Sequence, residues 1–520
     1  MPEHTDNFDR LDPGVWKAVS VSVLGSFLSQ LDATVVNVSL GSLAVELHSS
    51  LQTIQWVTSG YLLALALMLP LNGWLVERIG TKRLYLICFC GFTLSSVLCA
   101  LSWSADSLIG FRVLQGISGG LMAPLTQLMI ARAAGKHMVR VMGYVAVPVL
   151  LGPIVGPVVA GAILQHGSWR WLFLINLPIG VLAIVLASLF LPADNGTRSQ
   201  RSFDLVGFLT LSPALVLFLY GSDHLNKREG MVTLLLSVVL LATFFRKALK
   251  DGPRGLIDLQ LFRGEVFSAS ALTQFTVNGL SFAGQMLIPA YLFLDVGKSP
   301  SATGWLMAPM GLGMVCTYPW VGRLTQRLGI RGTSSTGALI AFLGTLPFFY
   351  LSSKHFSLAI LAVALFIRGI GMSAVGVPSI SAAYASVRKE ELPMATTSLN
   401  IVQRLGGPTL TTVCATFLGW RLAGVHSESM SSAFTMCFIL LCSLHVLLIL
   451  AARRLPRTLE SVEHPPVLPA EKCTRCTVRA RTAAKLGIPS STFDHRNQSL
   501  ENRQEAIQVP LKPLDSPHSP

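Results

Sequence analysis

The sequence predicts an all-α membrane protein that crosses the bilayer many times. Of its 520 residues, 51% are hydrophobic and only 13% are charged, and its mean hydropathy is +0.57. A soluble globular domain carries about twice this share of charged residues. Long apolar runs recur along the whole chain, and one loop pattern occurs twice. These observations predict a polytopic helical protein built from two related halves.

Apolar runs of roughly 20 residues, the length that crosses a bilayer as a helix, occur fourteen times. They lie near residues 16–40, 54–75, 84–103, 107–131, 141–164, 172–192, 205–222, 231–249, 267–292, 302–321, 334–352, 356–383, 397–420 and 433–452. Pro213 interrupts the seventh run, and Arg246 and Lys247 end the eighth. We therefore predict fourteen transmembrane helices.

The runs divide the chain into five parts. We predict a cytoplasmic N-terminal segment (1–15), a six-helix half (16–192), a linker with two extra transmembrane helices (193–266), a second six-helix half (267–452) and a disordered cytoplasmic tail (453–520). The first segment lacks the basic region of a signal peptide, so the first span is expected to direct its own insertion. The tail is rich in proline, serine and charge, which favours disorder.

Basic residues are distributed unevenly between alternate loops. One set of loops holds eighteen lysines and arginines, and the alternate set holds six. The positive-inside rule places the first set in the cytoplasm, and an even number of spans then places both termini there. This topology accounts for most of the net charge of +14 without a nucleic-acid partner. We expect a multi-pass protein of the inner or plasma membrane.

One carboxylate, Asp32, lies inside the first apolar run, whereas the other acidic residues lie in loops, tails or helix ends. A charge at bilayer depth costs roughly 3 kcal/mol or more and by default indicates function. Asp32 could instead lie near its helix end and reach the interface. Arg112, in the fourth run, is the expected counter-charge. The alternative for Arg112 is that backbone carbonyls hold it.

A glycine-rich loop with acidic and basic residues follows the second run. Its expected gating residues are Gly73, Glu77, Arg78, Gly80, Lys82 and Arg83. Small glycines allow two helix ends to approach closely while charges of both signs lie within reach. A similar pattern follows the tenth run, at residues 322–331. Such a repeat suggests duplicated halves.

The fifth run contains a stripe of small residues and several prolines. Gly152, Gly156 and Ala160 recur every four residues, so one helix face is nearly bare and a neighbouring helix can pack or slide against it. Pro153 and Pro157 each remove a backbone donor and bend the helix. The combined GPxxGP spacing is unusual for a passive span.

Together these segments resemble the major facilitator superfamily, and within it the fourteen-helix drug:proton antiporters of the EmrB/QacA type. The resemblance rests on LDATVVNVSL at 31–40, the loop at 73–83, the segment around Arg112, the GPxxGP helix, and residues 169–180 and 203–207. It implies a major facilitator fold with two six-helix halves and two extra central helices. The loop departs from the family pattern with Glu77 and Thr81, and its second copy has no acid.

The resemblance implies proton-coupled multidrug efflux by alternating access, with export of hydrophobic or cationic compounds. Asp32 would carry the proton, with Arg112 as its partner. Export of one metabolite or siderophore, or a non-transporting receptor or scaffold, stays open. The sequence contains no HExxH and no phosphate-binding loop, so we do not expect an enzyme.

Polar and aromatic residues at depth are candidates for a substrate cavity, although many such residues face lipid. The candidates are Trp56, Tyr61, Gln115, Gln274, Phe275, Asn278, Phe282 and Gln285. Arg368 and Arg404 could attract an anionic group or satisfy carbonyls, and Arg404 favours the second role.

The expected partners are small hydrophobic substrates and the lipid bilayer, while a periplasmic adaptor stays open. We expect no cofactor, no metal and no nucleic acid. The tail holds one CxxC, Cys473 and Cys476, and lacks the second pair that a zinc site needs.

Overall fold

A computed structural model describes residues 13–194, 202–225, 227–252, 255–353, 356–423 and 430–458. The chain divides into two units, Met1–Glu463 and His464–Pro520, and the described residues all belong to the first. Residues 1–12 and 459–520, with Cys473 and Cys476, lie outside the described part. The predictions for the N-terminal segment and for most of the tail therefore stay predictions.

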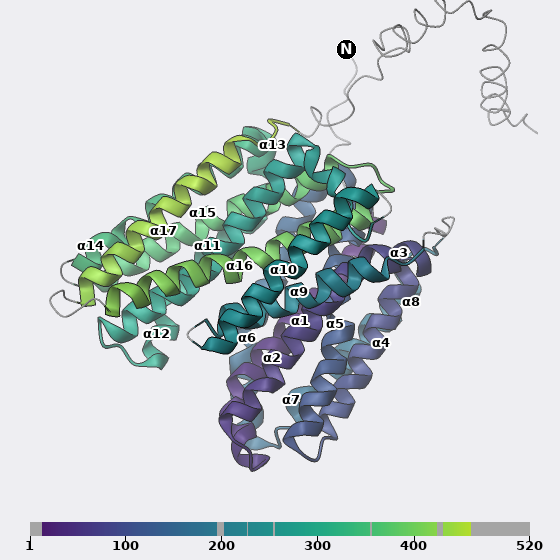
Figure 1. The fold of residues 1–520 in the computed structure, drawn as a ribbon, viewed down its shortest axis with the longest axis horizontal. Helices are drawn as coiled ribbons and strands as arrows, with labels where there is room; N and C mark the ends of the chain where they lie inside the picture. Colours follow the sequence, from purple (N-terminus) through teal and green to yellow (C-terminus); the bar gives the residue numbers. More distant parts are fainter. Residues whose placement is uncertain are drawn as a thin grey trace, which may run out of the picture. The chain divides into compact units, whose positions relative to one another are not determined.

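The first half is built from long helices, as predicted (Figure 1). They are α1 (Pro13–Glu46), α2 (Leu51–Met68), η1 (Leu69–Leu71), α3 (Asn72–Ile79), α4 (Thr81–Ala100), α5 (Ala105–Ala134), η2 (Gly135–His137), α6 (Met138–His166), α7 (Trp171–Leu174) and α8 (Asn176–Phe190). Helices satisfy their backbone polar groups internally, which is required in lipid. Polar caps set several ends: Ser104 and Ser107 form a capping box at the start of α5.

The second half repeats this arrangement after two connecting helices. The connecting helices are α9 (Leu205–Asp223) and α10 (Arg228–Asp251), followed by η4 (Leu259–Arg263). The second half comprises α11 (Glu265–Leu294), α12 (Pro300–Leu306), α13 (Ala308–Thr345), α14 (Pro347–Ser353), α15 (Leu358–Ala385), α16 (Leu392–Ala423) and α17 (Met430–Arg453). Gly329 has non-helical torsion angles and breaks α13 into two parts.

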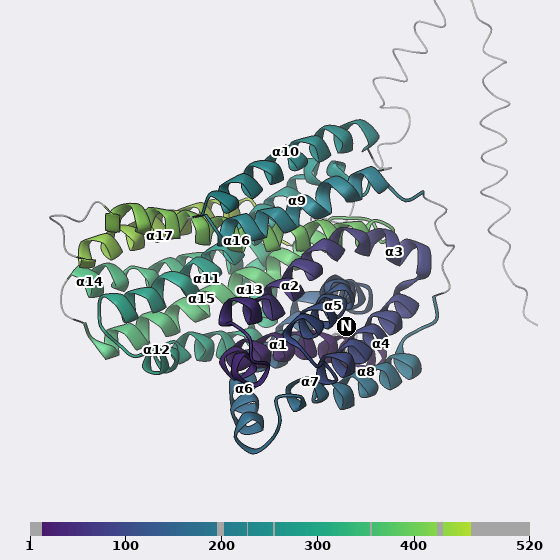
Figure 2. The same cartoon turned by 60° about the horizontal axis from the view of Figure 1, so that its bottom comes forward.

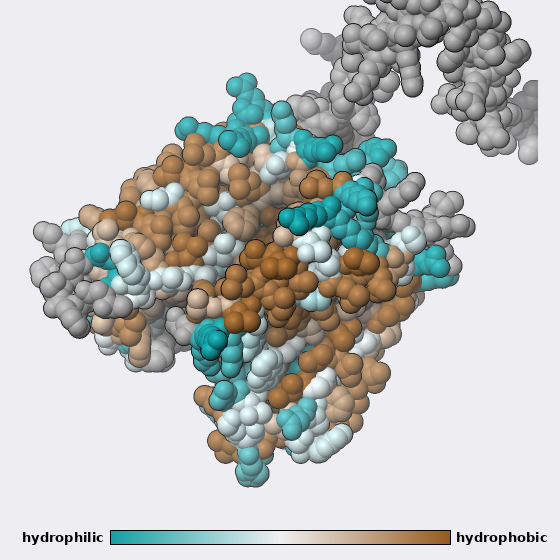
Figure 3. Space-filling model, viewed as in Figure 1, coloured by the Kyte–Doolittle hydropathy of each residue, from teal (hydrophilic) through white to brown (hydrophobic). Residues whose placement is uncertain are grey.

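Among the described residues, eleven helical segments are long and apolar enough to cross a membrane. One of them, Ala302–Ser352, contains the break at Gly329. The helices α6 and α16, with 29 and 32 residues, are long enough as well but are not among the eleven. The structure therefore supports a polytopic helical fold, while the number fourteen stays a prediction. Hydrophobic residues cover the flanks of the helices, and hydrophilic ones gather near their ends (Figure 3).

The two copies of the glycine-rich loop share one capping arrangement. In the first half, Gly80 adopts φ +99°, and Asp194 accepts hydrogen bonds from the backbone N–H groups of Thr81, Lys82 and Arg83. A Cβ at Gly80 would lie 2.4 Å from the Asp194 carboxylate. Only glycine therefore allows this close approach.

In the second half, Gly329 adopts φ +74°. There the N–H groups of Ile330 and Arg331 donate to the carbonyls of Arg457 and Pro456. In each half, the chain after the last long helix thus caps the third one. The second copy is capped by backbone carbonyls, whereas the first is capped by the Asp194 carboxylate.

The extra helices α9 and α10 lie against both halves. They pack on one another, and α9 contacts α2 of the first half and α16 of the second (Figure 2). Trp56 of α2 stacks on Tyr220 of α9 with ring centroids 6.0 Å apart. Large apolar side chains of α10, such as Leu235 and Val239, are exposed, as expected where a helix faces lipid.

A polar network fixes the base of the extra helix pair. Asp204 caps α9 through Gly207 and also accepts hydrogen bonds from Leu256 N–H and from Lys247, which binds Asp251 as well. Burial opposes ionisation of Asp204, but these hydrogen bonds outweigh it and lower the pKa of its carboxyl group below the usual value. The network therefore stabilises the pair only while Asp204 is ionised.

We expect the attachment of α9 to weaken in acid. A lowered pKa contributes stability above the unfolded-state value of about 3.9, and this contribution is lost as the pH falls through the folded-state value. The protection of α9 amides against hydrogen exchange, measured relative to the intrinsic exchange rate at each pH, should therefore fall at and below about pH 4 in the native chain. In Asp204→Asn, this protection should be lower at neutral pH and should change little over the same range. Equal acid sensitivity in both proteins would contradict this assignment.

Candidate functional site

Asp32 lies in a fully buried polar cluster inside the first half. Its side chain accepts hydrogen bonds from Arg112 at 2.7 Å, from Asn176 at 2.7 Å and from Gln115 at 3.2 Å. The side chains of Asp32 and Arg112 are both 0% exposed. Three helices, α5, α8 and α1, therefore meet at this carboxylate. The structure does not place Asp32 at the interface, the alternative left open by the sequence.

Arg112 is held by more than its ion pair. Its Nε donates to the carbonyl of Val57, Nη1 also donates to Gln115 at 2.5 Å, and the guanidinium lies over the ring of Tyr61 at 4.2 Å. Arg112 is therefore held both by the ion pair with Asp32 and by a backbone carbonyl, which was the alternative left open by the sequence. Removing one member of such a buried pair leaves an uncompensated charge, which is strongly destabilising.

Sequence reasoning missed two members of the cluster. Asn176 begins α8 and donates to Asp32, while Ser96 of α4 accepts from Gln115 at 2.7 Å. The side chains of both are fully buried. Asn176 is a polar residue in the apolar stretch at 171–190, and that contrast was the available signal. No comparable signal marks Ser96, because serine is common in membrane helices.

The small-residue stripe of α6 packs against α1 next to Asp32. A Cβ at Gly152 would lie 2.9 Å from the Cβ of Gln30, and one at Gly156 would lie 2.3 Å from Oγ1 of Thr34. Thr34 also donates to the carbonyl of Gly152 at 3.3 Å. The neighbour of the predicted stripe is thus the helix that carries Asp32. The side chains of Pro153 and Pro157 lie outside the described part.

The predicted gating loop lies where the two halves meet. Gly73 is packed against Pro393 and Thr397 of α16, and Asn72 donates to Thr397 at 3.2 Å. Lys82 donates to the carbonyls of Ser188 and Leu191 at the end of α8. Glu77 is half-buried, and Arg78 and Arg83 are exposed.

Two further contacts join the halves at the same end. Gln127 of α5 accepts hydrogen bonds from Tyr384 of α15 at 2.6 Å and from Asn400 of α16 at 2.9 Å. On the other side, a Cβ at Gly143 of α6 would lie 2.4 Å from the carbonyl oxygen of Tyr318 in α13. These contacts hold the loop-bearing ends of the halves together.

The predicted substrate residues do not form one site. Tyr61, Gln115 and Gln274 were expected to line a cavity, but they are at most 1% exposed. Tyr61 and Gln115 instead hold Arg112, and Gln274 donates to Gly376 and Ser379 of α15. These three expectations are wrong for this conformation, because polar groups at depth pair with one another when neighbouring helices bring partners.

The other candidates are more accessible. Asn278 is half-buried and donates to Gln274, and Phe275 is half-buried beside Gly406. Phe282 and Gln285 are exposed on α11. Trp56 is exposed in part and stacks on Tyr220.

The two later arginines differ in their surroundings. Arg368 of α15 is fully buried and donates to Thr345 and to the carbonyl of Leu280, both at 2.8 Å. Arg404 of α16 is half-buried, and within the described residues it has no hydrogen-bond or ion-pair partner. The expectation that Arg404 satisfies helix-end carbonyls is therefore wrong.

No group of three or more metal-ligating side chains occurs among the described residues. The buried cluster holds one acid, one base and neutral amides and hydroxyls. Such a set can bind or release a proton and can redistribute hydrogen bonds when it does so.

Comparison with known proteins identifies the family of this chain. The model of the Major Facilitator Superfamily matches residues 22–409 and, in a second match, 271–477. The chain is 33% identical over 434 residues to the "Multidrug resistance protein B homolog" of Mycobacterium tuberculosis, covering 82% of this chain and 80% of that one. It is 31% identical over 392 residues to the "Probable transport protein HsrA" of Haemophilus influenzae, covering 74% and 84%.

Solved structures share the fold. The human organic anion transporter MFSD10 (TETRAN) superposes with a TM-score of 0.58 at 17% identity, covering 85% of this chain and 100% of that one. The proton:xylose symporter XylE gives 0.58 at 16% identity, covering 84% and 95%. The named relatives are consistent with the drug:proton antiporter branch, and they indicate a transporter and not an enzyme. The chain is a multi-pass membrane protein that belongs to the major facilitator superfamily.

Proposed function

We propose that this protein exports hydrophobic small molecules in exchange for protons, by alternating access. The observation that carries the proposal is the buried pair of Asp32 and Arg112 within a network of neutral donors. A buried carboxylate inside a transporter half is a natural proton carrier, because its charge state decides which partners it can hold. Its multidrug-resistance relatives support the substrate class.

Protonation of Asp32 would change helix packing around it. The neutral acid no longer balances Arg112, and a proton on Oδ2, the oxygen that accepts from Arg112, faces the N–H donor of the guanidinium, while Oδ1 still accepts from Asn176 and Gln115. Helix α1 is then held less firmly to Arg112 of α5. Because α6 packs on α1 through Gly152 and Gly156, a shift of α1 reaches α6 directly.

Helix α6 also contacts the second half. Gly143 lies against Tyr318 of α13, and Gly322 of α13 lies against Arg140 of α6. A movement of α6 therefore changes the contact between the halves at the loop-bearing end. This route connects the proton site to the opening of that end through packed helices.

The loop-bearing end is the proposed cytoplasmic side, in the inner or plasma membrane, with both termini inside. The excess of basic loop residues there supports this orientation. In the described conformation, hydrogen bonds of Asn72 and Gln127 join the two halves at this end, which supports its assignment as the closed side. Export of cationic compounds, which the sequence also predicted, has less support. The acid that could attract them, Asp32, is fully buried and already paired with Arg112. An adaptor in the periplasm remains a separate proposal.

We expect Asp32→Asn to abolish substrate-triggered proton release. Everted membrane vesicles are energised, a pH-sensitive dye is followed, and a panel of lipophilic neutral and cationic compounds is added. The native protein should release protons from the vesicles on addition of a substrate. Asp32→Asn should show no release, because an amide cannot exchange a proton at this position.

Asp106→Asn is the matched control, because Asp106 is an exposed acid at the start of α5. It should behave like the native protein. Proton release that persists in Asp32→Asn would overturn the assignment of the carrier. A native protein that is inserted but never releases protons with any compound would overturn the proposed antiport.

A further inference from the structure

We propose that Arg404 binds an acidic group, so that the exporter prefers amphiphilic anions over cations of the same shape. This inference rests on the proposed export function and specifies its substrate class. The residue lies seven positions after the start of the predicted span at 397–420, which is about 10 Å along the axis of α16. Arg404 therefore lies within the predicted span, towards its loop-bearing end.

Arg404 differs from the other arginines at depth because the protein does not satisfy it. Arg112 has a carboxylate, an amide and a carbonyl, and Arg368 has a hydroxyl and a carbonyl. Within the described residues, Arg404 has neither a hydrogen bond nor an ion pair. A guanidinium at bilayer depth without a partner is costly, and a bound anion or water must compensate it.

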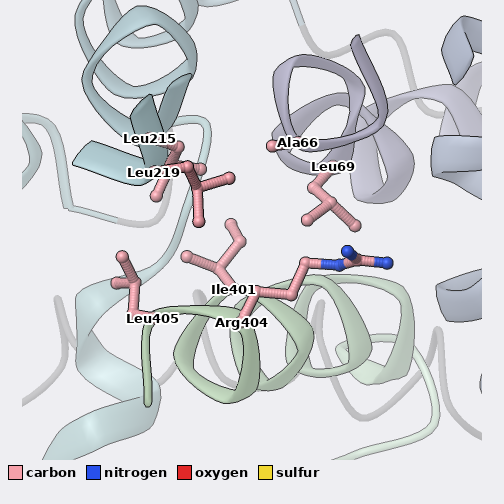
Figure 4. Close-up of a pocket in the computed structure, with 7 residues that line it drawn as sticks. All are labelled: Ala66, Leu69, Leu215, Leu219, Ile401, Arg404 and Leu405. Atoms are coloured by element: carbon pink, nitrogen blue, oxygen red, sulfur yellow. The ribbon is translucent and has the colours of Figure 1, made fainter. Parts of the chain in front are cut away.

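The position of Arg404 makes it available to a ligand between the halves. It belongs to the second half, while Ala66 and Leu69 beside it belong to the first and Leu215 and Leu219 to α9. Its guanidinium extends past Leu69 and away from the leucines of α9 (Figure 4). It is one helical turn from Asn400, which closes the loop-bearing end through Gln127. Arg404 thus lies just inside that closure.

The surroundings match an acid with an apolar body. Five aliphatic side chains and one alanine line a small pocket with Arg404: Ala66, Leu69, Leu215, Leu219, Ile401 and Leu405. The pocket volume of ≈ 10 Å³ is room for about one water molecule. We therefore place the acid group at the guanidinium, which extends away from the leucines of α9 (Figure 4), with the apolar remainder along α2 and α16. A guanidinium binds a carboxylate or phosphate through paired hydrogen bonds.

The balance of charge points the same way. Among the described residues, no acidic side chain lies on α2 or within α16, and Asp32 is buried against Arg112. A cationic compound near Arg404 would meet a like charge with no carboxylate to offset it. A lipophilic acid would be attracted and partly neutralise the unpaired guanidinium.

Binding of one aromatic skeleton in three charge states tests the proposal. Pyrenebutyrate, its methyl ester and a pyrenebutyl-trimethylammonium salt are titrated at pH 7.5 into the full-length protein in phosphatidylcholine nanodiscs. We expect the native protein to bind the acid about tenfold or more tightly than the ester, and the cation most weakly. Tenfold corresponds to about 1.4 kcal/mol.

Two substitutions and a control separate charge from folding. Arg404→Gln should bind acid and ester equally, whereas Arg404→Lys should keep part of the preference because it keeps the charge. Arg246→Gln, which removes an exposed arginine of α10, should match the native protein. If Arg404→Gln does not fold, the comparison of Arg404→Lys with the native protein still tests the charge preference across the three ligands.

The result that overturns the proposal is equal affinity of the native protein for acid and ester, or an acid preference that survives in Arg404→Gln. An anionic lipid could supply the same chemistry, so phosphatidylglycerol is titrated in a separate arm. If phosphatidylglycerol stabilises the native protein but not Arg404→Gln, and pyrenebutyrate does not bind, Arg404 holds a lipid headgroup. That result would overturn the proposal that Arg404 binds a substrate. These binding data are independent of proton release, so failure here and failure of antiport are distinguishable.

Discussion

Arg112→Gln is expected to leave little folded protein, and a second substitution, Asp32→Asn, is expected to restore much of it. Glutamine cannot neutralise the Asp32 carboxylate, which is 0% exposed. Removing one partner of a buried ion pair typically costs about 3–5 kcal/mol. Replacing both partners by neutral groups removes that penalty, because no uncompensated charge remains.

Thermal unfolding of the full-length protein in detergent, arranged as a double-mutant cycle, checks this prediction. The double variant should unfold at a higher temperature than Arg112→Gln alone. It should nevertheless show no proton release, because the titratable group is gone. Strictly additive effects of the two substitutions would contradict the role of the ion pair in stability.

Gly143→Leu is expected to stop transport by keeping the loop-bearing ends of the halves apart. Even a Cβ at this position would lie 2.4 Å from the carbonyl oxygen of Tyr318, which belongs to the other half. Overpacking of this kind costs about 1–3 kcal/mol. A bias of that size changes the ratio of two conformations by roughly 5- to 150-fold.

Labelling of a cysteine at position 397 measures how far Gly143→Leu shifts the protein towards the conformation that is open at this end. Thr397 is fully buried where Asn72 meets it, so Thr397→Cys, in a background without native cysteines, reports opening of this end. A membrane-impermeant maleimide should react faster when Gly143→Leu is also present. Gly110→Leu is the control, because nothing lies within 4 Å of a Cβ at Gly110. Unchanged labelling with intact transport in Gly143→Leu would argue against this contact as a gate.

Much of the architecture follows from local pattern. Long apolar runs predict helices because a chain in lipid must satisfy its backbone internally. The repeat of the loops at 73–83 and 322–331 predicts duplicated halves, and the shared caps at Gly80 and Gly329 agree with it. The resemblance to the superfamily also points to the correct fold.

Other features depend on how helices are rotated and tilted. Lipid is as apolar as a protein core, so the hydrophobic pattern of a membrane helix says little about which face meets a neighbour. Tyr61 and Gln115 were therefore predicted to face a cavity and instead surround Arg112. The capping role of Asp194 could not be predicted from the sequence either, because Asp194 caps α4 from more than 110 positions further along the chain.

The sequence by itself determined that this chain is a helical membrane protein of two related halves with one acid at depth, Asp32. It could do so because the cost of burying a charge or an unpaired backbone group in lipid applies to each segment separately. Only the tertiary structure decided that Asn176 and Gln115 share that acid and that Arg404 has no partner among the described residues. Those facts depend on the packing of helices distant in sequence, which no local pattern specifies.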